Sequence, residues 1–347
     1  MAKTAHDYLK SVAKYEKTAK DYCTSSNFDE SYANIFPVIS KKKLWDLSTE
    51  YDKTRYKSLK KAIRTRFGAK NIVFGSGTED LIVRWGKLVT SKQQRVGIIL
   101  PIFYRVIECL GTYDFKKING LVQSDLNGLD AIFLSNPNPL TGKVINRDEI
   151  LSFSERNPDI TFYIDEASMF LLKSSNKYSL LNEAENRNNI TVLSSFSKLY
   201  GLSGERVGML SSNSKTVMEF ENIGPTYPVS ATASYILEYL LNFDSFFHQI
   251  LQVIENNKNE VETKLRTMAG LKVFPSATNC VFFKSNKELD LFKHLLELGV
   301  ISLNLDTQDG NKLPGAIRIT IHSSPTKHKY LLDKLGSLRG KLDFNKV

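Results

Sequence analysis

The sequence predicts an α/β protein with a mainly parallel sheet in a large domain and a smaller α+β domain. At 347 residues the chain exceeds the usual size of a single domain. Up to about residue 230, short apolar runs alternate with amphipathic stretches, which is typical of βα units. We therefore expect an N-terminal arm with part of the small domain (1–45), a large domain (46–235) and a C-terminal small domain (236–347).

Six apolar runs are the strand candidates of the large domain: residues 72–74, 96–100, 131–134, 162–164, 190–193 and 207–210. Nearly every run is followed by a polar or glycine-bearing turn, namely GSGTED, PIFY, SNPNPLTG, DEAS and SSFSK. Ligands of open α/β sheets bind at the carboxyl ends of the strands, so these turns are predicted to carry the functional site.

The pattern changes in the last third of the chain. Apolar residues between positions 246 and 265 recur at roughly helical spacing. Strand-like runs follow at residues 280–283 and 316–321. A long helix followed by separate strands is typical of a small α+β domain.

Composition excludes several classes of protein. Hydrophobic content of 41% and charged content of 24% are ordinary for a globular chain. No apolar run approaches the roughly 20 residues of a membrane span, and the polar N-terminus lacks the apolar segment of a secretory signal. The three cysteines, Cys23, Cys109 and Cys280, are far apart and predict reduced thiols without a metal site. We expect a cytoplasmic protein that does not bind a membrane.

The net charge of +10 raises the hypothesis of nucleic-acid binding. The denser basic runs, residues 41–43 and 57–66, lack the interleaved aromatics of RNA-reading modules. A solvated basic face, or attraction for phosphorylated and carboxylated metabolites, explains the charge equally well. We therefore expect small-molecule partners and no nucleic acid.

The segment SSFSKLYGLSGERVG, residues 194–208, places Lys198 just after a predicted strand. A lysine there could be a solvated surface cation. When desolvation or a neighbouring cation lowers its pKa, however, a lysine amine becomes a nucleophile that forms Schiff bases with carbonyl compounds. Arg206 is such a cation and also a candidate clamp for a phosphate.

Six motifs in order carry a resemblance to a known family: GSGTEDLI, PIF, NPNPLTG, YIDEAS, SFSKLYGLSGERVG and AIRITI. From about residue 50 to 322 the chain resembles the fold-type I, class I/II aminotransferases that depend on pyridoxal 5′-phosphate (PLP). It is most similar to the branch of histidinol-phosphate aminotransferases and threonine-phosphate decarboxylases. The resemblance implies that Lys198 holds PLP as a Schiff base and shuttles protons, and that Arg206 grips the cofactor phosphate.

The resemblance also assigns the groups around the cofactor ring and phosphate. A protonated pyridine nitrogen needs a carboxylate beside it, and Asp165 matches that carboxylate; alone it could be a helix cap or a turn acid. Ser76, Gly77 and Thr78 lie between strand and helix, where backbone N–H groups favour an anion. In this motif order they form a phosphate cradle, which the hydroxyl of Ser195 or Ser197 completes.

Three further residues match family positions. Phe103 corresponds to a ring stacked on the cofactor, with core packing as the alternative. Tyr56 resembles a tyrosine that reaches across a homodimer interface to the partner's cofactor phosphate, with half-buried packing as the alternative. Arg318 matches the arginine that binds the substrate carboxylate, or a phosphate in the phosphate-specific branch, with a surface cation as the alternative.

The chain departs from the family at three places. NPNPLTG replaces the usual NPNNPTG, so the asparagine contact to the pyridine O3′ either shifts to Asn138 or is lost, and we favour Asn138. Ser168 stands where the family has a tyrosine or another aromatic residue that helps hold O3′. Leu303, with Asn304 beside it, stands near the position where the histidinol-phosphate branch has an arginine for the substrate phosphate. Histidinol phosphate is therefore a less expected substrate.

Two enzyme classes follow from the resemblance. The favoured one is an aminotransferase that moves an amino group from a donor such as glutamate to a keto acid, aldehyde or phosphorylated ketone. The alternative is a decarboxylase or other lyase acting on an amino acid or phospho-amino acid. A non-enzymatic binder would be expected to lack Lys198 or Asp165. Transamination is favoured because a carboxylate clamped by Arg318 resists departure.

Overall fold

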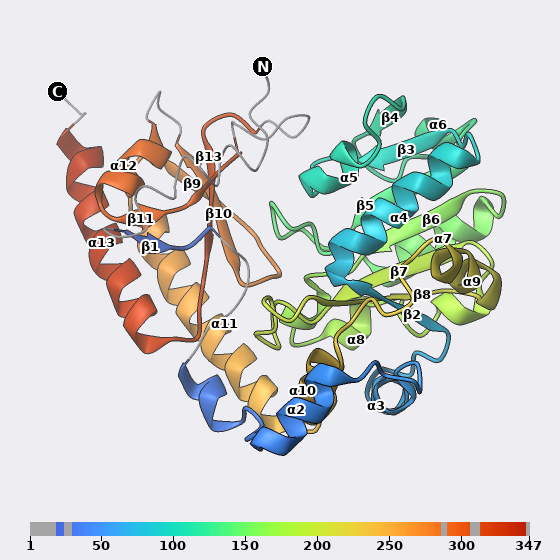
Figure 1. Ribbon diagram of the computed structural model, residues 1–347. Coiled ribbons are helices and arrows are strands. Elements are labelled where there is room, and N and C mark those ends of the chain that lie inside the picture. The colour runs from blue at the N-terminus through green and yellow to red at the C-terminus, as the bar shows by residue number, and fades with distance from the viewer. Residues whose placement is uncertain (1–18, 24–29, 286–289, 306–312, 345–347) are drawn as a thin grey trace.

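The computed structural model describes residues 19–23, 30–285, 290–305 and 313–344. Residues 1–18 and 24–29 of the predicted N-terminal arm lie outside this part of the chain. Figure 1 shows two units side by side, a small sheet backed by helices on the left and a large sheet with its helices on the right. The exact boundaries of the predicted domains stay a prediction.

Within the described residues, seven strands form the large sheet. They are β2 (Ile72–Ser76), β3 (Val96–Ile99), β4 (Phe115–Ile118), β5 (Ala131–Ser135), β6 (Thr161–Asp165), β7 (Ile190–Ser195) and β8 (Val207–Ser211). Their order is β2-β8-β7-β6-β5-β3-β4. The neighbours from β7 to β4 pair in parallel, whereas β8 is antiparallel to both β2 and β7. The predicted mainly parallel sheet is confirmed.

One strand of this sheet was not predicted. The sequence of β4 is FKKI, and both of its lysines are exposed. The strand lies at the edge of the sheet and pairs only with β3 among the described strands. An edge strand with a solvated face needs no continuous apolar run, so its sequence carries no strong strand signal.

Helices cover both faces of the large sheet. They are α3 (Lys57–Phe67), α4 (Gly77–Ser91), α5 (Tyr104–Glu108), α6 (Gln123–Leu126), α7 (Arg147–Arg156), α8 (Ser175–Tyr178), α9 (Ser214–Asn222) and α10 (Ala231–Leu240), with short 3₁₀ helices at Met169–Leu171 and Ala184–Asn186. Alternate residues of β5 enter two different apolar clusters. Phe133 packs against Trp85 of α4, whereas Ile132 and Leu134 join the cluster that contains Phe170. Both faces of the central strands are therefore buried.

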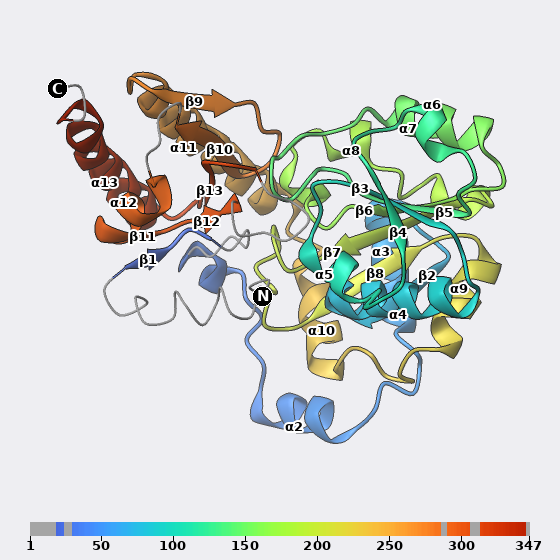
Figure 2. The same ribbon diagram turned by 90° about the horizontal axis from the view of Figure 1, so that it is seen from above.

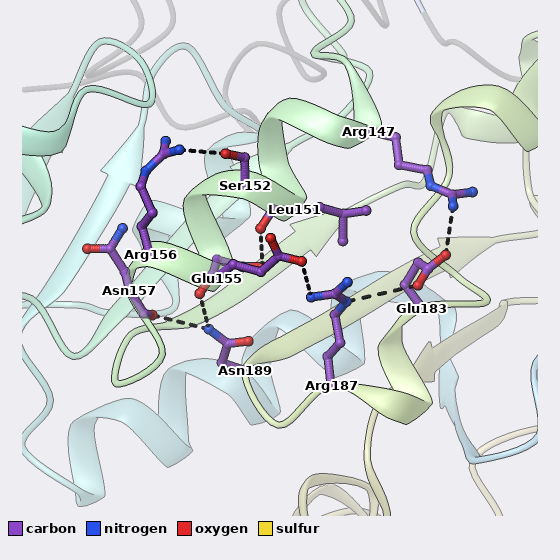
Figure 3. Close-up of polar contacts among 10 residues, drawn as sticks. Arg147, Leu151, Ser152, Glu155, Arg156, Asn157, Glu183, Arg187 and Asn189 are labelled. Atoms are coloured by element: carbon purple, nitrogen blue, oxygen red, sulfur yellow. Dashed lines mark hydrogen bonds and ion pairs between the residues drawn. The ribbon is translucent and has the colours of Figure 1, made fainter.

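A polar network on the outer surface fixes the start of β7, as Figure 3 shows. Arg187 pairs with Glu155 of α7 at 2.9 Å, and Asn189 Nδ2 donates to the Ser154 carbonyl at 2.9 Å. Glu183 joins the network by pairing with Arg147 at 2.7 Å. Because β7 begins at the next residue after Asn189, this network sets the position from which the strand runs to the loop of Lys198.

The small unit combines residues from both ends of the chain. Its elements are β1 (Lys20–Asp21), α11 (Asp244–Arg266), β9 (Leu271–Phe274), β10 (Cys280–Ser285), α12 (Leu291–Glu297), β11 (Val300–Ile301), β12 (Leu303–Asn304), β13 (Ala316–Thr320) and α13 (Pro325–Phe344). An antiparallel sheet has the order β12-β13-β10-β9, and β1 pairs in parallel with β11. The predicted long helix is α11.

The segment between the two units begins with a short 3₁₀ helix, Glu30–Asn34, and continues to α2 (Lys41–Thr49). Figure 2 shows α2 standing away from the large sheet on an extended segment. Among the described helices, none combines the length and the apolar character that crossing a bilayer requires.

We predict that Asp80→Ala will destabilise the large unit by roughly 3 kcal/mol, because it leaves a buried arginine without its charge partner. Arg84 is only 2% exposed, and its Nε donates to Asp80 Oδ1 at 3.1 Å. Urea unfolding followed by tryptophan fluorescence measures the loss. The matched control is Asp46→Ala, which removes an exposed pair with Lys42 and should cost less than about 0.5 kcal/mol. Equal effects of the two variants would contradict this prediction.

Candidate active site

The candidate site lies where the carboxyl ends of the central strands adjoin the small unit. β5 and β6 end side by side, with Ser135 opposite Asp165 in the register. The loop after β5 is bound by Arg318 of β13, whose Nη1 donates to the Pro139 carbonyl at 2.6 Å. The site is thus built from both units, at the edge of the sheet where the sequence places it.

Asp165 is a buried carboxylate, with 5% of its surface exposed. Its Oδ1 accepts the Ala167 N–H at 3.0 Å, and its Oδ2 accepts the Ser135 hydroxyl at 3.3 Å. Burial raises the pKa of Asp165, and the positive charge of Lys198 and these two hydrogen bonds act in the opposite direction. A cationic nitrogen placed beside this carboxylate would further stabilise its charged form.

Lys198 lies in the loop after β7 and is half-buried. Its Nζ donates to Ser168 Oγ at 2.7 Å, which brings together two of the predicted site residues. Burial lowers the pKa of Lys198; the charge of Arg318 lowers it further, whereas the charge of Asp165 raises it. A lowered pKa increases the neutral fraction of the amine, which is the nucleophilic form.

The start of α4 is pressed against β8 through two glycines. Gly77 has φ +73°, and its N–H donates to the Arg206 carbonyl at 2.8 Å. A Cβ at Gly77 would lie 2.5 Å from Arg206 Nη2, and one at Gly208 would lie 2.5 Å from the Thr78 nitrogen. The guanidinium of Arg206 is therefore held directly over the first residue of the helix.

This arrangement can hold an anion. The first N–H groups of a helix lack intrahelical partners and carry a partial positive charge, to which Arg206 adds a full one. Ser195 lies opposite Gly208 in the register, and its Oγ accepts the Ser197 N–H at 3.2 Å. The side chain of Arg206 is 46% exposed and its Nη2 is 4.0 Å from Glu79, so an anion can reach the guanidinium. Ser76 occupies the N-cap position of the same helix, where its side chain makes no capping hydrogen bond, and it is exposed.

Arg318 is a buried cation, with 5% of its surface exposed. Besides its bond to Pro139, it donates through Nη2 to the Cys23 carbonyl. Its Nε is buried and has no hydrogen-bond partner among the residues that the structure describes. Buried donors are normally satisfied, and an oxyanion is the partner that a guanidinium binds most strongly.

The side chain of Asn138 shapes the loop after β5. Its Oδ1 accepts the N–H groups of Leu140 at 3.0 Å and Thr141 at 3.1 Å, and its Nδ2 donates to the Pro101 carbonyl at 2.5 Å. Its contact with the pyridine O3′ stays a prediction. Phe103 is half-buried, packs edge-on against Tyr104 at 4.7 Å and borders the core, so its stacking role also stays a prediction.

Tyr56 is used inside its own chain. It is 5% exposed, and its hydroxyl donates to the Val229 carbonyl at 2.8 Å and accepts the Val229 N–H at 3.2 Å. Its ring packs edge-on against Phe74. Tyr56 therefore packs inside its own chain, as in the packing alternative, but it is buried where that alternative supposed a half-buried side chain. The reach of Tyr56 across a dimer interface stays a prediction.

Two buried groups near the site were not found by sequence reasoning. Glu166 accepts the Ser179 hydroxyl at 2.5 Å and the Leu180 N–H at 2.7 Å, and burial raises its pKa to about 8. Its position directly after Asp165 in the sequence was the signal that could have identified it. Cys280 is a buried thiol of β10 whose charge would act on Lys198. Nothing in the sequence places it there, because it comes from the other unit.

The donor set fits PLP. The start of α4 with Arg206 suits a phosphate, the buried carboxylate of Asp165 suits a cationic ring nitrogen, and the amine of Lys198 suits an aldehyde. The glycines at positions 77 and 208 allow Arg206 and β8 to lie directly against the start of α4. The unpartnered Nε of Arg318 adds a site for a carboxylate.

Comparisons with known proteins agree with this chemistry. The family model described as aminotransferase class I and II matches residues 45–335. A histidinol-phosphate aminotransferase of Thermoanaerobacter sp. (strain X514) is 31% identical over 60% of this chain and 56% of its own length. One from Staphylococcus haemolyticus (strain JCSC1435) is 26% identical over 78% of each chain.

Solved structures share the fold at low identity. The histidinol-phosphate aminotransferase from Clostridium acetobutylicum has a TM-score of 0.79 at 18% identity, covering 93% of this chain and 99% of its own. The L-threonine-O-3-phosphate decarboxylase from Porphyromonas gingivalis has a TM-score of 0.75 at 19% identity, covering 92% and 98%. At these identities the likeness establishes the fold.

We predict that Gly208→Ala will weaken PLP binding about 10-fold or more, because the added methyl pushes the start of α4 away from β8. Overpacking of this kind costs typically 1–3 kcal/mol, part of which would appear as lost cofactor affinity. Absorbance titration of the cofactor-free protein measures it. Gly204→Ala is the matched control, since a Cβ there meets nothing within 4 Å. Unchanged PLP affinity in Gly208→Ala would refute the assignment of this contact to the cradle.

We predict that Arg318→Gln will shift the reactivity of Lys198 to higher pH. Removing a positive charge that lowers the pKa of Lys198 raises that pKa, so the neutral amine appears only at higher pH. Acetylation of the cofactor-free protein at a series of pH values, quantified by mass spectrometry, gives the profile. Arg95→Gln, an exposed residue just before the amino end of β3 that pairs with Asp130, should leave the profile unchanged. A shift to lower pH would show that the charge of Arg318 does not act on Lys198.

Proposed function

The chain belongs to the class I and II aminotransferase family, and on this premise we propose that it transfers an amino group with the help of PLP. The donor would be an amino acid such as glutamate, and the acceptor a keto acid, aldehyde or phosphorylated ketone. The observation that carries the proposal is the position of Lys198, a half-buried amine on which the charges of both Asp165 and Arg318 act. A nucleophilic amine, a carboxyl group and a guanidinium that can bind a substrate carboxylate thus belong to one site.

PLP, when bound, supplies an electron sink that stabilises negative charge on the substrate carbon. Lys198 would hold the cofactor covalently through Nζ. Arg206, together with Ser76, Gly77, Thr78 and the hydroxyl of Ser195 or Ser197, would bind its phosphate. Asp165 would face the ring nitrogen and keep that nitrogen protonated, because a buried carboxylate favours a cation beside it.

Lys198 is also suited to carry the proton that transamination must move. As a free amine, Nζ would accept the proton of the substrate α-carbon and hold it for return to the reacting atoms. Its lowered pKa favours the neutral form that accepts the proton. The hydroxyl of Ser168 at 2.7 Å holds Nζ in place and can stabilise it after protonation.

Arg318 supports transamination over decarboxylation. Its free Nε and its second hydrogens on Nη1 and Nη2 can hold a substrate carboxylate. A carboxylate paired with a buried guanidinium is stabilised as an anion and resists leaving as carbon dioxide. The alternative, a decarboxylase of a phospho-amino acid, would require Arg318 to bind the distal phosphate instead.

Three accompanying features stay predictions. We expect a homodimer, with Tyr56 near the interface, small-molecule donors and acceptors as the partners, and a cytoplasmic location. Sedimentation of the purified protein tests the first of these independently of activity.

We predict that an amino donor will convert the bound PLP to pyridoxamine phosphate in stoichiometric amount with release of a keto acid. Glutamate and other amino acids are added one at a time to the PLP-loaded protein, and the absorbance of the cofactor is followed. Lys198→Ala should abolish the conversion because it removes the group that moves the proton. Catalytic release of carbon dioxide from a phosphorylated amino acid, without pyridoxamine phosphate, would establish the decarboxylase instead.

A further inference from the structure

We propose that the second substrate of this enzyme, the one exchanged with the amino donor, is an unphosphorylated keto acid with an apolar side chain, together with its amino acid. The inference rests on the proposed function and narrows its acceptor. It comes from the surroundings of Arg318, where two departures from the family pattern meet.

The sheet face around Arg318 is apolar. The antiparallel register places Leu303 of β12 and Phe282 of β10 directly opposite Arg318 on its two sides. Residues directly opposite on neighbouring strands point to the same face, with Cβ atoms about 4.5–5.5 Å apart. Leu303 and Phe282 are each 8% exposed. The stem of Arg318 is therefore flanked by two apolar side chains.

The loop after β5 adds a third apolar side chain to the same place. Leu140, the residue that distinguishes NPNPLTG, is 5% exposed and belongs to one buried cluster with Leu303, Phe282 and Cys23. The preceding residue, Pro139, gives its carbonyl to Arg318 at 2.6 Å. The bond thus holds Leu140 against the small unit, beside the guanidinium that would bind the substrate.

This environment suits one negative charge and disfavours a second. Within the described residues the Nε of Arg318 has no partner, and together with the second hydrogens of the terminal nitrogens it provides for one carboxylate. One hydrogen of each terminal nitrogen is already donated, to the carbonyls of Pro139 and Cys23. A phosphate dianion among Leu140, Phe282 and Leu303 would lose its hydration, and these three side chains offer it no charged or polar partner. An apolar side chain gains from burial at the same place. Leu303 and Leu140 are thus specificity-determining residues.

The direct test compares two non-reacting ligands by calorimetry on the PLP-loaded protein. 3-Phenylpropionate and 2-carboxyethylphosphonate share a carboxylate and a two-carbon spacer, and they differ in an apolar ring against a phosphonate. We expect the phenyl compound to bind at least about 10-fold more tightly. Equal or tighter binding of the phosphonate, or no binding of the phenyl compound, overturns the proposal.

This measurement needs no turnover, so its failure differs from failure of the proposed function, which the conversion of PLP to pyridoxamine phosphate reports. A protein that made no pyridoxamine phosphate and still preferred the phenyl ligand would refute transamination while supporting the apolar site. A protein that made pyridoxamine phosphate and preferred the phosphonate would support transamination and refute the apolar site.

A charge placed on the apolar face should change the preference. Leu303→Arg is expected to improve binding of the phosphonate relative to the phenyl ligand by on the order of 10-fold to 100-fold. Asn304→Arg adds the same charge to the same strand, on the opposite face, and should leave the ratio unchanged. Leu303→Met, which keeps the volume and the apolar character, should retain the preference of the unmodified protein.

An equal change in Asn304→Arg and Leu303→Arg would mean that overall charge sets the preference, and it would overturn the assignment to this face. Circular dichroism confirms that each variant is folded. If Leu303→Arg does not fold, the comparison of the two ligands on the unmodified protein still decides the question.

Discussion

A single guanidinium joins three segments that are far apart in the chain. Arg318 of β13 binds the carbonyl of Pro139 after β5 and that of Cys23 near the N-terminus. Both partners are neutral carbonyls, so they orient the guanidinium without cancelling its charge. The full positive charge therefore remains available to lower the pKa of Lys198 and to attract a carboxylate. The contacts of Arg318 with these carbonyls thus both connect the segments around the site and fix the position of its positive charge.

The sheet supplies the opposing charge. Parallel strands β5, β6 and β7 end at one edge, which brings Ser135, Asp165 and the loop of Lys198 together. Asp165 and Arg318 then act on Lys198 in opposite directions while burial lowers its pKa. An anion from one unit and a cation from the other thus both act on this amine. Its reactivity is thus a property of how the two units pack, as well as of its own loop.

The sequence predicted those parts of the fold that local physics determines. The buried strands of the large sheet were found from their apolar runs, whereas the candidate site residues were assigned from the turns that follow them and from the family resemblance, and their roles stay predictions. β4 was missed because FKKI keeps two exposed lysines at a sheet edge. The antiparallel direction of β8 has no signature in its own residues. The hydroxyl of Tyr56 binding Val229 and the thiol of Cys280 near Lys198 depend on long-range packing, which a single sequence does not display.

The two departures at Leu140 and Leu303 show what packing adds to sequence. In the sequence they lie in separate motifs, and only Leu303 suggests a lost polar contact. In the structure both side chains enter one buried cluster beside Arg318. Substitutions of residues in contact have coupled effects on the free energy. A polar group at either position would lie against the apolar side chain at the other and would lose its hydration there. The pair therefore gives the surroundings of Arg318 one continuous apolar character, which is the feature from which the apolar substrate is proposed.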